Sequence, residues 1–312
     1  MHIDLPNWMG GLDNELKSIP ITSLAIPGTH DSMTYTITKD ASVAPDSEKL
    51  VRQLIKFCGF IIRPIVYRWC ITQTCTVLEQ LDLGIRYFDL RLATKEGTDG
   101  IYFCHGLYGA KVNEVFQDIR DFLDSHPKEI VILDSQHFYA FTDADHENYI
   151  CLLERMFPTM LCPIPRSIAD VTLNWMMQNQ YRVIAIYRNN HAESKNFLWG
   201  SVLWPTPWPE TMSTDELLKF LESRLNKRSH SIGLVSQCVL TPTNGTVLKS
   251  PFSGVRSKCA IPSCKAVLPW LDQKQQGSVN VAIADFIQID NHSFPSTVIA
   301  LNYKQKLNSL SY

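Results

Sequence analysis

The sequence lacks the features that mark several large classes of protein. No apolar stretch reaches the about 18 residues that a membrane-spanning helix needs, and the closest candidate, residues 57–62, is ended by Arg63 and Pro64. The first residues carry acids and an early proline instead of a basic segment followed by an apolar one, so no secretory signal is expected. A glycine-rich phosphate loop of the Gly-x-Gly-x-x-Gly or Walker type is also missing, which argues against a nucleotide-binding fold.

The chain has no excess of one charge and no closely spaced cysteine pair of the zinc-binding kind. Lys and Arg number 29 against 31 Asp and Glu, a formal net charge of −2. This balance argues weakly against nucleic acid as the main partner, because phosphate contacts need a local basic excess. The nine cysteines include no Cys-x-x-Cys, so we expect free, mostly buried thiols in a reducing, intracellular compartment.

The chain contains enough apolar residues to form a large hydrophobic core. It is 312 residues long, 45% hydrophobic and 19% charged, which excludes disordered and fibrous proteins. The length would allow two domains, but a single α/β barrel is often of this size.

Short apolar, β-branched runs alternate with amphipathic stretches, which predicts an α/β fold. Strands are expected at residues 21–26, 84–92, 101–104, 129–135, 182–187, 232–240 and 279–287. Helices are expected at 48–69, 112–126, 145–157, from Ser213 onward and at 295–306, with a long loop at 241–269. Several strands are apolar without alternation, as in parallel sheets buried on both faces. We therefore predict a single barrel, in which an eighth strand lies within 241–275 or is missing.

Polar residues stand where several of these strands end. His30 and Asp31 directly follow the first strand, and His105 ends another. Asp89 and Arg91 alternate with apolar neighbours on one strand, so both face the same way. Catalytic groups of barrels lie at this C-terminal rim. A turn histidine and a buried ion pair are the structural alternatives.

Two histidines and an arginine form a combination suited to cleaving phosphodiesters. One imidazole can remove a proton from a nucleophile, the other can protonate a leaving alkoxide, and a guanidinium can neutralise the phosphorane. Asp285 lies in the last strand, which neighbours the first in a barrel, so it can orient the first histidine; an ion pair or a helix cap is the alternative. Arg188 and Gln136 also follow strands, whereas the direction of Asp134 stays open.

Six segments of the chain resemble the X domain of phosphatidylinositol-specific phospholipase C, in the order of that family. They are IPGTHDS, GIRYFDLR, FCHGL, EIVILDSQHFY, IAIYR and ADF. The resemblance runs from about Pro20 to Tyr303 and is strongest to the small eukaryotic proteins that consist of little more than this domain. It implies an N-terminal extension at 1–19, an X domain at 20–305 with a distorted or incomplete TIM-like barrel, and a tail at 306–312.

The resemblance also implies roles for individual residues. His30 matches the general base that deprotonates the inositol 2-hydroxyl, and His105 the general acid that protonates the diacylglycerol oxygen. Arg91 matches an arginine that stabilises the phosphate charge, as in the bacterial enzymes. The products would be diacylglycerol and a cyclic inositol phosphate.

Further positions of the family site are filled by acids and polar residues. Asp285 matches the acid that orients the base, Asp31 an acid beside the base, and Asp89 an acid near the arginine. Arg188 matches an arginine that contacts inositol, and Gln136 stands near a glutamate ligand of the calcium-dependent enzymes. A guanidinium in the place of the metal predicts catalysis without calcium or another cofactor. The substrate-binding acid expected near Gln237 is absent.

A lipid substrate requires a means of reaching a bilayer. The basic and apolar stretch 49–69, with Phe60 and Ile61, and the loop 203–209, with Trp204 and Trp208, are the predicted membrane-docking segments. A core-facing helix and a rigid loop are the alternative.

Together these features predict a cytoplasmic, peripheral-membrane phospholipase C. A metal-dependent barrel phosphodiesterase acting on soluble glycerophosphodiesters and a phosphoinositide-binding protein with little turnover are the competing hypotheses.

Overall fold

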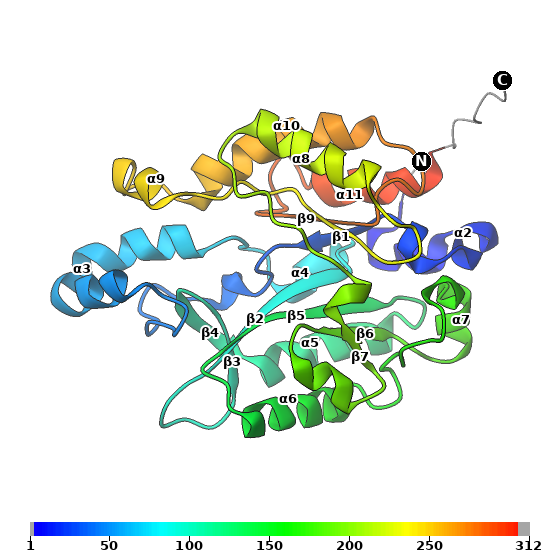
Figure 1. Ribbon diagram of the computed structural model, residues 1–312, viewed down its shortest axis with the longest axis horizontal. Helices are drawn as coiled ribbons and strands as arrows, with labels where there is room; N and C mark the ends of the chain where they lie inside the picture. The colour runs from blue at the N-terminus through cyan, green and yellow to red at the C-terminus, as the bar shows by residue number, and fades with distance from the viewer. Residues whose placement is uncertain (1–2, 305–312) are drawn as a thin grey trace.

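A curved, mostly parallel sheet forms the centre of the computed structural model, which describes residues 3–304 (Figure 1). Its main path runs in the order β7–β6–β5–β2–β1–β9–β8, with every neighbouring pair parallel. The bounds are β1 (Ile26–Thr29), β2 (Tyr87–Thr94), β5 (Val131–Tyr139), β6 (Val183–Tyr187), β7 (Leu198–Gly200), β8 (Val235–Gln237) and β9 (Val281–Ala284). β3 (Ile101–His105) pairs antiparallel with β2, and β4 (Leu107–Lys111) with β3. The prediction of a single α/β, distorted TIM-like barrel is confirmed.

The barrel is incomplete between its two outer strands, and an irregular segment bridges the gap. Within the described residues β7 and β8 form no ladder. Instead the Gly233 N–H donates to the Leu203 carbonyl at 2.9 Å and the Val235 N–H to the Pro205 carbonyl at 3.0 Å. Trp204 is fully buried at this seam, and a Cβ at position 233 would overlap its indole ring. Glycine is therefore required where the two segments approach.

Helices cover the outer face of the sheet and both ends of the barrel (Figure 1). The longer ones are α3 (Lys49–Cys70), α5 (Val112–Ser125), α6 (Asp143–Met156), α8 (Thr214–Asn226), α10 (Ile261–Asp272) and α11 (Ser293–Ala300). The shorter ones are α1 (Trp8–Gly11), α2 (Asn14–Ser18), α4 (Val77–Asp82), α7 (Leu173–Gln178) and α9 (Asn244–Lys249). Within residues 3–304, none of these helices has the length and apolar character needed to cross a bilayer.

Local sequence signals account for several helix boundaries. The apolar stripe of α5 is buried as predicted, and the helix ends just before His126 and Pro127. The Ser213 side chain accepts a hydrogen bond from the Glu216 N–H, which starts α8 at the predicted place. Thr142 and Asp145 form a capping box that begins α6 at Asp143.

Some predicted elements were wrong. Residues 21–23 form a 3-10 turn, so β1 starts only at Ile26. The predicted loop 241–269 contains α9, a π-helical turn at Arg256–Ala260 and most of α10, because its sparse apolar residues pack on the barrel despite the loop-like composition. No eighth strand lies in 241–275, and the sequence did not indicate β4 or β7. The predicted helix 295–306 ends as α11 at Ala300, followed by a 3-10 turn at Leu301–Tyr303; residues 305 and 306 and the predicted tail lie outside the described residues.

The N-terminal segment packs against the end of the barrel at which the strands begin. Trp8, Met9 and Leu12 of this segment are buried in the inner core cluster with Ile26 and Ile132. The Trp8 indole N–H donates to the Gly84 carbonyl at 2.8 Å. This end of the barrel is therefore filled with apolar side chains, and the polar side chains gather at the other end.

Candidate active site

The inner face of the sheet changes from apolar to polar at the C-terminal ends of its strands. Inward-facing positions alternate along each strand, and polar or charged residues follow apolar ones on this face. Asp89, Arg91 and Asp134 lie within β2 and β5, Gln237 ends β8, and His30, Arg188 and Asp285 directly follow β1, β6 and β9. The candidate site is this polar layer.

His30 and Asp285 form a hydrogen-bonded pair just beyond the ends of the neighbouring strands β1 and β9. β1 and β9 are adjacent and parallel, with Thr29 opposite Ala284, so the next residue of each strand lies at the same level. His30 Nδ1 is 2.8 Å from Asp285 Oδ1. A carboxylate accepts only, so Nδ1 carries a proton and Nε2 is the nitrogen that faces the site.

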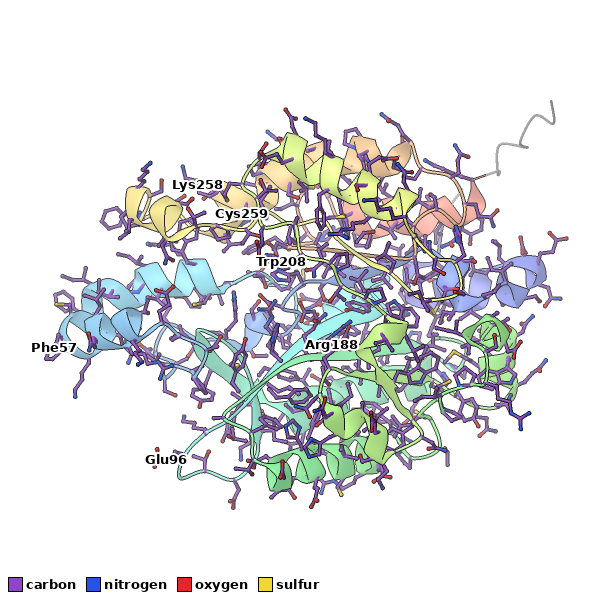
Figure 2. All side chains as sticks on the ribbon, in the orientation of Figure 1. Phe57, Glu96, Arg188, Trp208, Lys258 and Cys259 are labelled. Carbon is purple, nitrogen blue, oxygen red and sulfur yellow. The ribbon has the colours of Figure 1, made fainter. Side chains whose placement is uncertain are left out.

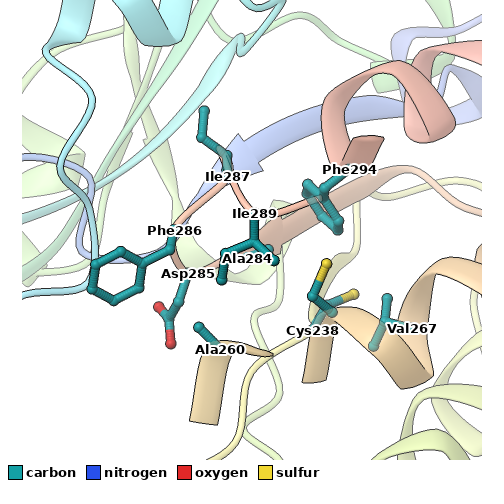
Figure 3. Close-up of a pocket in the computed structure, with 10 residues that line it drawn as sticks. Cys238, Ala260, Val267, Ala284, Asp285, Phe286, Ile287, Ile289 and Phe294 are labelled. Atoms are coloured by element: carbon teal, nitrogen blue, oxygen red, sulfur yellow. The ribbon is translucent and has the colours of Figure 1, made fainter. Parts of the chain in front are cut away.

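Asp285 is backed by apolar side chains on its other side. Figure 3 shows a narrow pocket between the end of β9 and α10, lined by Asp285, Cys238, Ala260, Phe286 and Phe294 among others. Burial in these surroundings raises the pKa of Asp285, and the neighbouring His30 lowers it. The pocket lies on the helix side of the sheet, away from Arg91 and His105, so we do not consider it the substrate site.

Arg91 lies between two buried carboxylates. Its Nε is ion-paired with Asp31 Oδ1, and its Nη2 lies 3.7 Å from Asp89 Oδ2. The same Nη2 is 3.2 Å from His30 Nε2. The guanidinium is thus held beside the His30 ring, and the Arg91 side chain remains 18% exposed.

His105 contacts the same carboxylate. Its Nδ1 donates to the Cys70 carbonyl at 2.7 Å, and its Nε2 lies 3.3 Å from Asp31 Oδ2. His30 Nε2 lies 3.5 Å from that same oxygen. The two imidazoles are therefore close together, each with its Nε2 beside one oxygen of Asp31.

The charges around His30 set its protonation. Burial and the nearby Arg91 lower its pKa, but Asp31 and Asp285 outweigh them and raise the pKa to about 9. Burial raises the pKa of Asp31, whereas Arg91 and the two histidines lower it more, so this carboxyl stays ionised. At neutral pH the deprotonated form of His30 is therefore the minor one.

The same cluster is the place where a metal ion would be sought. Ligand atoms of His30, Asp31 and Asp89 lie within 4.8 Å of one another. However, the Arg91 guanidinium already contacts both carboxylates and supplies positive charge at this point. A divalent cation does not fit between them while Arg91 is in place.

The two predicted substrate-binding residues belong to a second network on the inner face. Arg188 donates to Asp134 through Nε at 2.8 Å and Nη2 at 2.6 Å. Gln136 lies in a bulge of β5, and its amide donates to the Tyr87 hydroxyl at 3.2 Å. The Tyr87 hydroxyl in turn donates to Asp134, so the open question about Asp134 is settled: it faces the barrel interior.

The predicted docking residues fall into two groups. Trp204 is fully buried at the barrel seam, so its assignment to membrane docking was wrong; the apolar loop fills the gap between β7 and β8. Trp208 is half-buried, and its ring lies 5.2 Å from the His30 ring, centroid to centroid, so it packs beside His30 and does not project from the surface as an anchor. In contrast, Phe60 and Ile61 on α3 are 84% and 52% exposed, and Figure 2 shows neighbouring Phe57 at the outer tip of the molecule.

Several site residues were not predicted. Tyr87 could have been found by following the alternation of Asp89 and Arg91 back along β2. The buried Oε1 of Gln237 has no hydrogen-bond partner and faces the polar layer. The contacts of Cys70 use its backbone carbonyl, for which a sequence gives no signal.

Comparison with known proteins gives relatives of similar length. No family model matches the chain. It is 35% identical over 306 residues to human PI-PLC X domain-containing protein 3, a match that covers 96% of this chain and 94% of the relative. Mouse PI-PLC X domain-containing protein 2 is 36% identical over 301 residues, covering 95% and 87%. Human PI-PLC X domain-containing protein 1 is 32% identical over 309 residues, covering 96% and 92%.

Solved structures share the fold at lower identity. The phosphatidylinositol-specific phospholipase C of Listeria monocytogenes superimposes with a TM-score of 0.68 at 18% identity, covering 96% of this chain and 99% of that one. The S. aureus phosphatidylinositol-specific phospholipase C, solved in work on the modulation of its membrane binding, gives 0.67 at 16% identity, covering 96% and 98%. Both agree with a distorted barrel.

Proposed function

The chain belongs to the family of PI-PLC X domain-containing proteins, and from this membership we propose that it cleaves phosphatidylinositol-type lipids at the phosphodiester bond. The observation that carries the proposal is that His30 Nε2 and His105 Nε2 both lie within 3.5 Å of one oxygen of Asp31, with Arg91 ion-paired to the same carboxylate. That arrangement offers a base, an acid and a fixed cation around one phosphate. The names and the shared fold of the relatives support the substrate class.

The first chemical step is an attack by the substrate on its own phosphorus. His30 Nε2 takes the proton of the inositol 2-hydroxyl, and the resulting oxygen forms a bond to phosphorus. Asp285, hydrogen-bonded to Nδ1 at 2.8 Å, stabilises the imidazolium that forms. Arg91 offsets the negative charge that develops on the phosphorane oxygens.

The second half of the step releases the lipid. The bond between phosphorus and the diacylglycerol oxygen breaks, and His105 Nε2 gives its proton to that oxygen. The products are diacylglycerol and a 1,2-cyclic inositol phosphate, which water can open by the same groups with their roles reversed. Arg188 and Gln136 would contact inositol from the neighbouring network.

Arg91 also supports independence from calcium. The guanidinium provides the positive charge that a metal ion provides in a metal-dependent phosphodiesterase, and it already occupies the space between Asp31 and Asp89. We therefore propose catalysis without a metal or another cofactor.

The assay that tests this function uses purified protein, phosphatidylinositol vesicles and excess chelator. We expect a cyclic inositol phosphate to form at the same rate with and without chelator, as followed by phosphorus NMR. Activity that requires calcium would overturn the metal-free mechanism. Vesicle binding without any release of inositol phosphate would instead favour a phosphoinositide-binding protein.

Exposed apolar side chains at one end of the molecule form the docking surface that we propose for the bilayer. They are Phe57, Phe60 and Ile61 on α3 together with Leu248 and Phe252 at α9. α3 and α9 project from the same end (Figure 1), and Asn244 at the start of α9 donates to Glu48 at the start of α3. Exposed basic residues surround them, including Lys56, Lys249 and Lys258. Apolar insertion with a basic surround suits an anionic membrane surface, and nine free thiols suit its cytoplasmic side.

Changing Phe57 and Phe60 to serine is expected to weaken vesicle binding. Each ring is at least 80% exposed, so little packing is lost, while removing two inserted rings should lower the affinity by about 100-fold. Sedimentation with phosphatidylinositol-containing vesicles measures the effect. Ile164→Ser, which removes a 41% exposed apolar side chain outside the docking surface, is the control. Equal loss in both variants, or unchanged binding by the double variant, would contradict docking through α3.

A further inference from the structure

The last residue of α3 and the residues that follow it contact the segments that carry His30, Asp285 and His105. The last residue of α3, Cys70, offers its carbonyl to His105 Nδ1 at 2.7 Å. A carbonyl can only accept, so Nδ1 carries a proton and the ring is held with Nε2 toward Asp31, free to carry the second proton of an imidazolium. The orientation of the proposed acid thus depends on where the backbone of α3 ends.

Gln73, three residues later, joins the two loops that carry the base and its carboxylate. Its side chain is fully buried. Its amide nitrogen donates to the His30 carbonyl at 3.1 Å and to the Ala284 carbonyl, next to Asp285, at 2.8 Å. Each hydrogen of the Gln73 amide is therefore donated to one of the two segments, one after β1 and the other at the end of β9.

Thr72 supports the same two loops through its backbone and side chain. Its carbonyl accepts from the Phe286 N–H at 2.7 Å, and its hydroxyl lies 3.1 Å from the His30 carbonyl. These contacts begin where the regular ladder ends, because β1 stops at Thr29 and β9 at Ala284. Both chains then turn sharply, with left-handed backbone angles at Asp31 (φ 42°) and Phe286 (φ 47°). Beyond the paired residues Thr29 and Ala284, the β1–β9 ladder continues with one backbone hydrogen bond, from the His30 N–H to the Ala284 carbonyl at 3.2 Å.

We propose that Gln73 is a positioning residue which holds His30 and Asp285 at hydrogen-bonding distance, and that the segment Cys70–Gln73 links this pair to His105 and to α3. The inference rests on the proposed function for its catalytic consequence, although the contacts themselves do not. A misplacement of about 1 Å at reacting groups can cost about 100-fold in rate. A side chain that ties two irregular loops together at this point therefore affects turnover without touching substrate.

Replacing Gln73 by methionine tests the role, because methionine has a similar length and no hydrogen-bond donor. The matched control is Gln80→Met. Gln80 is also fully buried, donates to two carbonyls, those of Ser32 and Cys75, at 2.9 Å each, and accepts from the Thr29 hydroxyl at 2.8 Å, but it bonds neither His30 itself nor the Asp285 loop. We expect Gln73→Met to lower kcat by about 100-fold with KM within about 2-fold, and Gln80→Met to keep kcat within about 3-fold.

A second measurement follows the His30 ring itself by NMR, with its signal assigned from the His30→Gln variant. The groups that face His30 are Asp31, Asp89, Asp285, Arg91 and, through Asp31, His105. In Gln73→Met the contact between His30 and Asp285 should be weaker, so the pKa of His30 should fall from about 9 toward the ordinary value of about 6.5. Because the deprotonated ring is the active base, the rise of kcat/KM with pH should then occur at lower pH than in wild type. Gln80→Met should titrate like wild type.

The outcomes separate this inference from the proposed function. If Gln73→Met matches Gln80→Met in both kcat and the His30 titration, the positioning role is overturned. If wild type turns over no lipid, the proposed function fails, and the His30 titration alone still decides whether Gln73 holds the pair.

Discussion

Replacing His30 by alanine is expected to lower kcat on phosphatidylinositol by at least about 1000-fold, because no other group is placed to take the hydroxyl proton. Removing the ring also leaves the buried Asp285 without its partner at 2.8 Å. The rate of cyclic inositol phosphate formation, measured by phosphorus NMR, checks the prediction. His126→Ala, which removes an imidazole outside the site that stacks on Phe122, should leave the rate unchanged.

The proposed acid can be separated from the base by the choice of leaving group. His105→Ala should slow release of diacylglycerol by about 100-fold to 10,000-fold. It should have little effect on a substrate with a nitrophenolate leaving group, which departs without a proton. His30→Ala should be slow on both substrates. If His105→Ala loses activity equally on both, the assignment of His105 as the acid is wrong.

Replacing Glu129 by alanine is expected to destabilise the protein by about 3 to 5 kcal/mol, because it leaves the charge of Arg86 buried and unpaired. Glu129 and Arg86 are both fully buried and joined through Arg86 Nη2 at 2.8 Å and Nε at 3.0 Å. Glu129 also accepts from the backbone N–H of Gly10 at 2.8 Å, and Arg86 donates to the Pro6 carbonyl at 2.7 Å. The pair therefore ties the N-terminal segment to the barrel. Urea unfolding measures the loss.

A surface ion pair provides the comparison for this variant. Glu154 and Lys195 lie 3.0 Å apart, but each is about two-fifths exposed. Glu154→Ala should cost less than about 1 kcal/mol. An equal loss of stability in the two variants would show that the pairing of Arg86 is not what stabilises this end of the barrel.

Much of the site could be predicted because strand ends are visible in a sequence. His30, Asp89, Arg91, His105 and Asp285 each interrupt or follow a short apolar run. Parallel strands bring four of these positions to one rim, whereas His105 reaches it from the end of β3, which is antiparallel to β2. The structure brings all five together, and with them Asp31. The direction of Asp134 could not be read in this way, because Val131, Ile132 and Leu133 before it are all apolar and buried.

The remaining features depend on tertiary contacts that composition does not reveal. The stretch 241–269 has a loop-like composition, yet α9 and α10 form there because residues such as Val255 and Val267 find a surface to pack on. Tryptophan is a residue type common in membrane anchors, but the Trp204 side chain fills the gap between β7 and β8 and is fully buried. The contacts of Cys70 and Gln73 end on backbone carbonyls, which every residue has.

The bond between His30 and Asp285 joins residues that stand 255 positions apart. During synthesis the first of them leaves the ribosome long before the second exists. A growing or prematurely terminated chain would therefore carry both imidazoles and the arginine, yet lack the carboxylate that orients the base. In the mechanism proposed above, phospholipid cleavage would begin only once nearly the whole polypeptide has been made and β9 has docked beside β1.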